Sequence, residues 1–98
     1  MLAQIRIYTI HEGQMDQFIT LWQEHIAPLR KSLGFEIPNA WISVQTNQFY
    51  WIMQYDGPKA WEELDQAYFD SPQRAAMQPD PKTLIARSET YFVEKVIK

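Results

Sequence analysis

Two short stretches of the sequence share one pattern: QIRIYTIHEG at residues 4–13 and FYWIMQYDGP at residues 49–58. Each begins with β-branched and aromatic residues that are typical of a strand. Each then reaches a turn with a glycine, Gly13 in the first stretch and Gly57 in the second. Because an amphipathic helical pattern follows each turn, the chain is interpreted as two copies of one strand–helix–strand unit.

The first helix is predicted from Gln14 onward, because apolar residues recur at steps of three and four. Its stripe consists of Met15, Phe18, Trp22, His25, Leu29 and Ser32. Gly34 is expected in the left-handed conformation just past the helix end, with Phe35 packing back. Pro28 lies within the pattern and has no backbone N–H, so we expect a kink in the last turns.

The second half of the chain is interpreted in the same way. A second helix is expected to begin at Pro58, where a missing N–H costs nothing. Ser71 is expected to cap one further short helical turn that Pro72 opens. The apolar stripe of the second helix consists of Trp61, Leu64 and Tyr68. The remaining strands are expected at residues 40–45, 49–55 and 84–96.

The resulting order over residues 1–98, interpreted as a single domain, is strand, helix, strand, strand, helix, strand. Right-handed crossovers in both halves lead to a four-stranded antiparallel sheet with two helices on one face. The first and third strands lie in its middle. This is the ferredoxin-like βαββαβ sandwich of the α+β class.

Composition excludes several classes of protein. The 98 residues carry a net charge of −3, which argues against nucleic acid as a partner. No apolar run approaches the roughly 18 residues of a membrane span, and no export signal precedes the first strand. The absence of cysteine excludes disulfides, thiolate metal sites and a cysteine nucleophile. We therefore expect a cytoplasmic protein that needs neither a metal nor a cofactor.

The third strand is apolar on both faces, because residues 49–53 read Phe-Tyr-Trp-Ile-Met. Two helices cover one face of the sheet, so the other would expose an aromatic patch to which Trp41 and Tyr8 also contribute. We expect a second copy of the chain packed face to face, closing a barrel-like homodimer, or an assembly of dimers, with a cavity between the sheets. The alternative is that the C-terminal segment folds over this face.

A sequence of weak motifs runs along nearly the whole chain. IRIYTI at residues 5–10 leads through HEGQMDQF at residues 11–18 into the first helix. Further motifs are Trp22, Pro28-Leu29, Gly34-Phe35, Ala40-Trp41, Asn47 and IMQYD at residues 52–56. In their order and spacing these motifs resemble the NIPSNAP family, in which a strand ending in Arg-x-Tyr-Thr leads through a glycine into an amphipathic helix.

The resemblance implies a dimeric α+β barrel and little defined chemistry. Two positions depart from the family pattern, which often has Trp in place of Met53 and Ser in place of Gly57. Antibiotic-biosynthesis-type monooxygenases share the fold and are less similar. Their second helix usually carries histidines, whereas residues 61–68 contain none.

Arg6 and Tyr8 are the strongest candidates for a binding site. If Ile5 and Ile7 face the helices, Arg6 and Tyr8 point into the dimer cavity. A guanidinium there cannot lose its charge and needs a partner, either Glu89 on a neighbouring strand or the carboxylate or enolate of a ligand. The further candidate lining residues of this cavity are Trp41, Tyr50 and Gln54, for which plain interface packing is the alternative.

Other charged residues are given structural interpretations. His25 is expected within the apolar stripe of the first helix, and His11 in an exposed turn. Arg30 is interpreted as a cation favoured by the C-terminal end of that helix. Glu62, Glu63 and Asp65 are interpreted as a solvated helix face.

Two classes of function remain open at this stage. The favoured one is a binding module that holds a small apolar or aromatic molecule. The second is a cofactor-independent enzyme of the monooxygenase or isomerase type, which requires a titratable group beside an apolar pocket. A purely structural role in a larger assembly is the third possibility.

Overall fold

The computed structural model describes residues 1–97 as an antiparallel sheet with helices on one side. The elements in chain order are β1 (Leu2–Ile10), α1 (Met15–Leu21), the π-helical turn η1 (Trp22–Ile26), α2 (Ala27–Ser32), β2 (Glu36–Ser43), β3 (Gln48–Tyr55), α3 (Trp61–Asp70), α4 (Pro72–Ala75), the 3₁₀ turn η2 (Pro81–Thr83) and β4 (Ile85–Val93).

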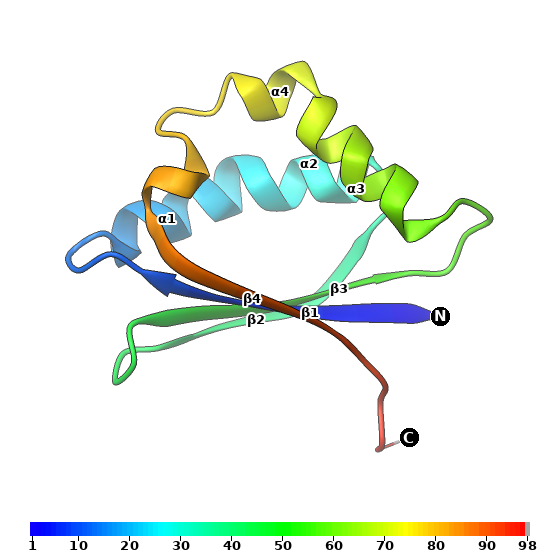
Figure 1. The fold of residues 1–98 in the computed structure, drawn as a ribbon, viewed down its shortest axis with the longest axis horizontal. Coiled ribbons are helices and arrows are strands. Elements are labelled where there is room, and N and C mark those ends of the chain that lie inside the picture. The colour runs from blue at the N-terminus through cyan, green and yellow to red at the C-terminus, as the bar shows by residue number, and fades with distance from the viewer. Residues whose placement is uncertain (98) are drawn as a thin grey trace.

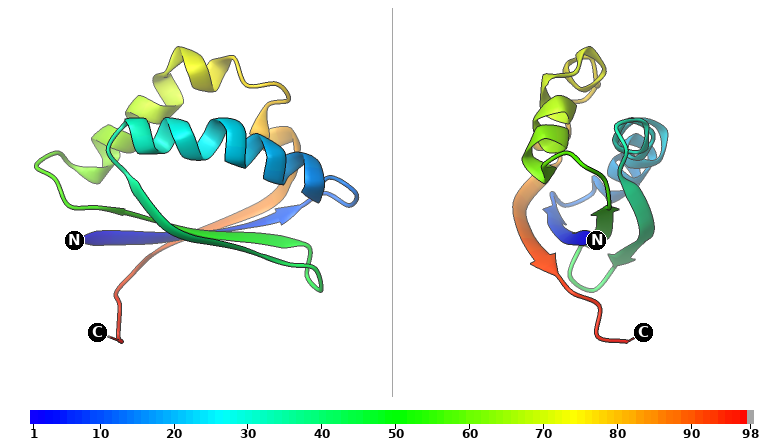
Figure 2. Two further views of the ribbon diagram at one scale, coloured as in Figure 1. Left: turned by 180° about the vertical axis from the view of Figure 1, so that it is seen from behind. Right: turned by 90° about the vertical axis from the view of Figure 1, so that its right-hand side faces the viewer.

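The four strands lie in the order β2-β3-β1-β4, and every neighbouring pair is antiparallel. The helices form a layer above one face of this sheet, and the other face has no helix over it (Figure 1). Seen end on, α1 and α2 lie on the β2 side and α3 on the β4 side (Figure 2). The predicted ferredoxin-like α+β fold, with the first and third strands in the middle, is confirmed.

The first helix is continuous from α1 through η1 to α2. The N–H of Ala27 donates to the carbonyl of Trp22, five residues back, as a π-helical turn requires. This turn comes immediately before Pro28, which lies in the first turn of α2 and has no N–H to donate. The irregularity expected from Pro28 therefore takes the form of a π-helical turn that precedes it.

The end of α2 follows the predicted left-handed motif. Gly34 has a φ of 113°, and the Phe35 N–H donates to the carbonyl of Arg30 at 3.2 Å. The Gly34 N–H donates to Lys31, so both hydrogen bonds of a Schellman motif are present. Phe35 is buried, and it packs edge-on against Trp61 with ring centroids 4.9 Å apart.

Three predicted boundaries are wrong by three residues or more. The α3 helix begins at Trp61 instead of Pro58, with Ala60 still extended. Strand β2 begins four residues earlier than expected, at Glu36, and tolerates Pro38 because β2 is an edge strand with an irregular register there. Strand β4 ends at Val93, which pairs with Ala3 at the start of β1, so the residues beyond it have no strand to join.

The core lies between the helices and the sheet. Alternate residues of β3, Phe49, Trp51 and Met53, are buried beneath the helices. The predicted stripe of α3 meets them there, since Trp61, Leu64 and Tyr68 are all buried. In residues 1–97 no helix is both long and apolar enough to cross a bilayer.

Candidate functional site

The five residues predicted to line one cavity lie on opposite faces of the sheet. On β1, Arg6 and Tyr8 face the helices, while Ile5 and Ile7 face away from them; the assumed orientation of β1 is therefore wrong. Both sets of side chains on β1 are largely apolar, so alternation alone could not orient the strand. The other three predicted residues, Trp41, Tyr50 and Gln54, share the open face with Ile5 and Ile7.

The helix-facing orientation of Arg6 is explained by a carboxylate on α3. Oδ1 of Asp65 accepts from Nη2 of Arg6 at 3.1 Å and from Nη1 of Arg30 at 2.6 Å. The side chains are 11% exposed for Arg6, 2% for Arg30 and 29% for Asp65. Side chains from β1, α2 and α3 thus meet at a single oxygen atom.

Of the two partners left open for Arg6, Glu89 is excluded, because the two side chains lie on opposite faces of the sheet. Glu89 pairs with Ile7 in the β1–β4 register, not with Arg6. Its carboxylate accepts from the Tyr91 hydroxyl at 2.9 Å on the open face. Arg6 instead completes its local contacts by donating from Nε to Oε1 of Gln4 at 2.9 Å.

Arg30 is held between charged and aromatic groups. Its guanidinium carbon lies 3.6 Å from the centroid of the Tyr68 ring and 5.4 Å from that of Phe35, both within cation–π distance. Its Nε is buried without a hydrogen-bond acceptor. Burial, followed by the neighbouring Arg6 cation, lowers the pKa of the Arg30 guanidinium. Asp65 offsets these effects only in part, since it is shared with Arg6.

This group of side chains opens onto a pocket of about 360 Å³ between the helices and the sheet. Aromatic and aliphatic side chains form much of its wall, and several cations border it. Its lining residues include Arg6, Tyr8, Arg30, Tyr68, Arg74 and Ala86. Among the residues that line it, none is an aspartate or a glutamate.

A second ion pair holds the segment that forms the outer wall of the pocket. The Ser71 hydroxyl accepts from the Arg74 N–H at 3.1 Å, which confirms the predicted cap of α4. Nη2 of Arg74 then donates to Oδ1 of Asp80 at 3.1 Å, and the same oxygen accepts from the Lys82 N–H at 3.0 Å. The Lys82 N–H and Arg74 together lower the pKa of Asp80, which favours the charged form of its carboxylate.

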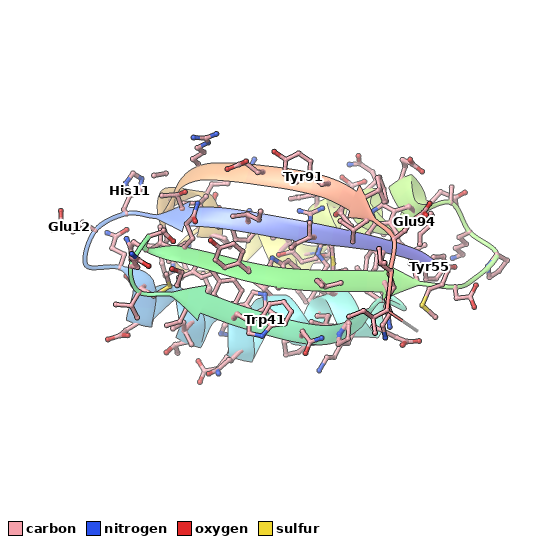
Figure 3. The ribbon with its side chains drawn as sticks, turned by 90° about the horizontal axis from the view of Figure 1, so that it is seen from below. His11, Glu12, Trp41, Tyr55, Tyr91 and Glu94 are labelled. Atoms are coloured by element: carbon pink, nitrogen blue, oxygen red, sulfur yellow. The ribbon has the colours of Figure 1, made fainter. Side chains whose placement is uncertain are left out.

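The open face of the sheet carries a separate set of aromatic residues. Trp41 is 50% exposed and Tyr91 is 52% exposed, on the two edge strands (Figure 3). The residues between them on the central strands, each half-buried, are Ile5, Ile7, Tyr50 and Ile52. The chain beyond Glu94 passes one end of this face, but Val96 and Ile97 are exposed and do not cover it.

Neither histidine joins the pocket. His11 is exposed in the turn after β1, as predicted (Figure 3). His25 is also exposed, so its predicted place in the apolar stripe is wrong; the π-helical turn shifts the phase of the helix there and buries Ile26 and Ala27 instead. Within residues 1–97 no group of three or more His, Asp or Glu side chains could hold a metal ion.

Two important residues of the pocket region were given other interpretations from the sequence. Asp65 was assigned to a solvated helix face and Arg30 to the C-terminal end of the first helix. Each nevertheless follows a buried residue by four positions, Trp61 and Ile26 respectively. Residues four apart lie on the same side of a helix. That spacing was the available signal that both charges lie at the edge of the core.

The sheet order, the antiparallel pairing and the one-sided helix layer define a ferredoxin-like α+β protein with a cationic, aromatic pocket beneath its helices. The family model described as NIPSNAP matches residues 3–96, and the chain therefore belongs to the NIPSNAP family. No curated protein matches it in sequence.

Solved structures share this fold at low sequence identity. An uncharacterized NIPSNAP domain protein from Burkholderia xenovorans is 20% identical, with a TM-score of 0.82 over 97% of this chain and 94% of that one. A NIPSNAP family protein from Agrobacterium tumefaciens strain C58 is 18% identical, with a TM-score of 0.84 over 95% and 90%. A putative antibiotic biosynthesis monooxygenase from Nitrosomonas europaea is 9% identical, with a TM-score of 0.71 over 99% and 100%.

Proposed function

We propose that this protein binds a small aromatic molecule in the pocket between its helices and its sheet. The observation that carries the proposal is the pocket of about 360 Å³, in which aromatic walls surround a few fixed polar groups. Small-molecule sites commonly occupy roughly 300–1,000 Å³ and combine these two features. The site proposed for the ligand thus lies within one chain, whereas the sequence suggested a cavity between two copies.

The polar groups of the pocket favour binding over proton transfer. Arginine stays charged at all ordinary pH values, so Arg6 and Arg30 can hold a ligand but cannot act as bases. The Tyr68 hydroxyl is neutral near pH 7, and burial raises its pKa further above that range. A pocket with these groups orients a bound molecule through donors that do not titrate.

The proposal is tested by titrating the ¹⁵N-labelled protein with aromatic compounds, including 1-naphthol, 1-naphthamide and 1-naphthoate, and following amide shifts. We expect shifts to concentrate at Tyr68 and Ala86. Ala86→Trp should fill the pocket and abolish these shifts. Ala67→Trp is the matched control, because Ala67 is exposed on α3 and does not line the pocket. Binding that survives Ala86→Trp would place the ligand elsewhere.

A cofactor-independent monooxygenase or isomerase is the second candidate. It is favoured by the fold shared with the putative antibiotic biosynthesis monooxygenase from Nitrosomonas europaea, which aligns over 99% of this chain. Oxygen uptake, or isomerisation followed by NMR, in the presence of a compound that binds the pocket decides between the two. Turnover that Ala86→Trp removes would establish an enzyme, and unchanged compound would leave a binding protein.

We also propose that the open face packs against the same face of a second copy. This rests on the exposed Trp41 and Tyr91 and on the apolar central strands between them. Light scattering should give twice the 11.7 kDa mass of the chain, or a multiple of that. Trp41→Glu should yield monomers, whereas Ile42→Glu, on the other face of the same strand, should not. A wild-type monomer at micromolar concentration would contradict the interface.

A further inference from the structure

The charges beneath the helices do not balance within this chain. Oδ1 of Asp65 forms an ion pair with both Arg6 and Arg30. Among residues 1–97, Asp65 is the one carboxylate within ion-pair distance of either guanidinium. One positive charge is therefore left over at a place where Arg30 is almost fully buried. A buried cation without a partner is costly, and arginine cannot relieve that cost by losing a proton.

Further cations border the pocket, and two of them have carboxylate partners outside it. Five of the lining residues are cationic, and they are Arg6, Arg30, Arg74, Lys82 and Arg87. Asp80 pairs with Arg74, and Glu89 lies 3.6 Å from Arg87 on the exposed side. The Nε atoms of Arg30 and Arg74 are both buried without an acceptor. The surplus positive charge of the pocket therefore lies at its inner end, at Arg6 and Arg30, beside aromatic walls.

We infer that the ligand of this pocket is an aromatic carboxylate, whose anionic group binds at Arg6 and Arg30 beside Asp65 while its ring lies along the apolar wall. This inference rests on the proposed small-molecule function and specifies its ligand class. A carboxylate matches the planar guanidinium, which can donate two parallel hydrogen bonds to it. The ring would contact apolar lining residues such as Ile26 and Ile85, and Lys82 at the pocket edge would attract the anion.

The test compares acids with their uncharged amides by isothermal titration. We expect 1-naphthoate and benzoate to bind the wild type about tenfold to a hundredfold more tightly than 1-naphthamide and benzamide. Arg6→Met leaves Arg30 and Asp65 as a balanced pair, so it should reduce binding of the acids by a similar factor and leave the amides unchanged. Lys31→Met is the matched control, because that side chain is an exposed cation on α2 and does not line the pocket.

Asp65→Asn should change the affinity for 1-naphthoate in the direction opposite to Arg6→Met. It removes the carboxylate that competes for both guanidiniums, so it should tighten binding of 1-naphthoate even though the free protein becomes less stable. A purely structural ion network would show the loss of stability without tighter binding. Thermal unfolding of each variant establishes that it is folded before the titration.

The contrary outcomes are distinct. Equal affinity for 1-naphthoate and 1-naphthamide would overturn the anionic ligand and leave the pocket proposal standing. If inorganic phosphate competes with 1-naphthoate at equal concentration, the pocket holds a general anion site and the assignment of an aromatic carboxylate is overturned. If none of the four aromatic probes shifts the backbone amide NMR signals of the pocket residues, the proposed function itself is overturned.

Discussion

The guanidinium of Arg30 lies 3.6 Å above the ring of Tyr68 while it donates to Asp65, three residues earlier on the same helix as Tyr68. Arg30 therefore joins the two helices through an aromatic face and a carboxylate that lie about one turn apart. Since Arg6 reaches the same carboxylate from the sheet, this contact couples β1, α2 and α3 around the pocket. Variants around it test both stability and binding.

Asp65→Asn is expected to lower the free energy of unfolding by about 2–4 kcal/mol in the absence of ligand, because it leaves two buried or half-buried cations without an anion. Urea unfolding at pH 7 measures the change. Glu62→Gln, an exposed substitution on the same helix, is the control and should stay within about 0.5 kcal/mol of the wild type. Equal stability of the two variants would show that Arg6 and Arg30 are well solvated.

Trp22→Ala is expected to destabilise the protein by roughly 3–5 kcal/mol, the usual cost of removing an aromatic side chain from a core. The Trp22 ring lies 5.1 Å from Phe49 and 5.5 Å from Trp51 between ring centroids. Gln23 is the next residue and is exposed, so Gln23→Ala serves as the control in the same denaturant unfolding series. A loss below about 1 kcal/mol would mean that these aromatic contacts contribute little.

Gly57→Ala is expected to destabilise by about 1–3 kcal/mol, because a methyl group there would overlap the ring of Tyr55. Tyr55 cannot move freely, since its hydroxyl accepts from the Lys59 N–H at 3.2 Å and its ring packs on Phe35. A double-mutant cycle isolates this clash. In the Tyr55→Ala background, Gly57→Ala should be neutral or stabilising; an unchanged cost there would point to the backbone instead.

Asp80→Ala is expected to cost about 0.5–2 kcal/mol at pH 7, because the carboxylate caps the turn at Lys82. The folded-state pKa of Asp80 lies below its usual value, so its contribution is present above the pKa of the unfolded chain. It is lost as the pH falls through the folded-state value. The unfolding curves of the wild type and of Asp80→Ala should therefore differ at pH 7 and coincide in strong acid.

Local patterns were sufficient to predict most of the fold. The strand pattern before Gly13 and the apolar stripe of α3 are local signals, and right-handed crossovers leave few ways to combine them. The left-handed end at Gly34 and the cap at Ser71 are also short-range features that neighbouring residues produce. For this reason the ferredoxin-like order could be derived without knowledge of any long-range contact.

The pocket depends on contacts that no local pattern contains. Strand β1 presents apolar side chains on both faces, Ile5 and Ile7 on one and Tyr8 and Ile10 on the other, so hydrophobicity did not choose between them. On the face that Arg6 takes, its counter-ion is Asp65, 59 residues away in the chain. A charged side chain turns toward the face where a buried counter-ion lowers its cost, and the position of that counter-ion exists only once the helices have packed on the sheet.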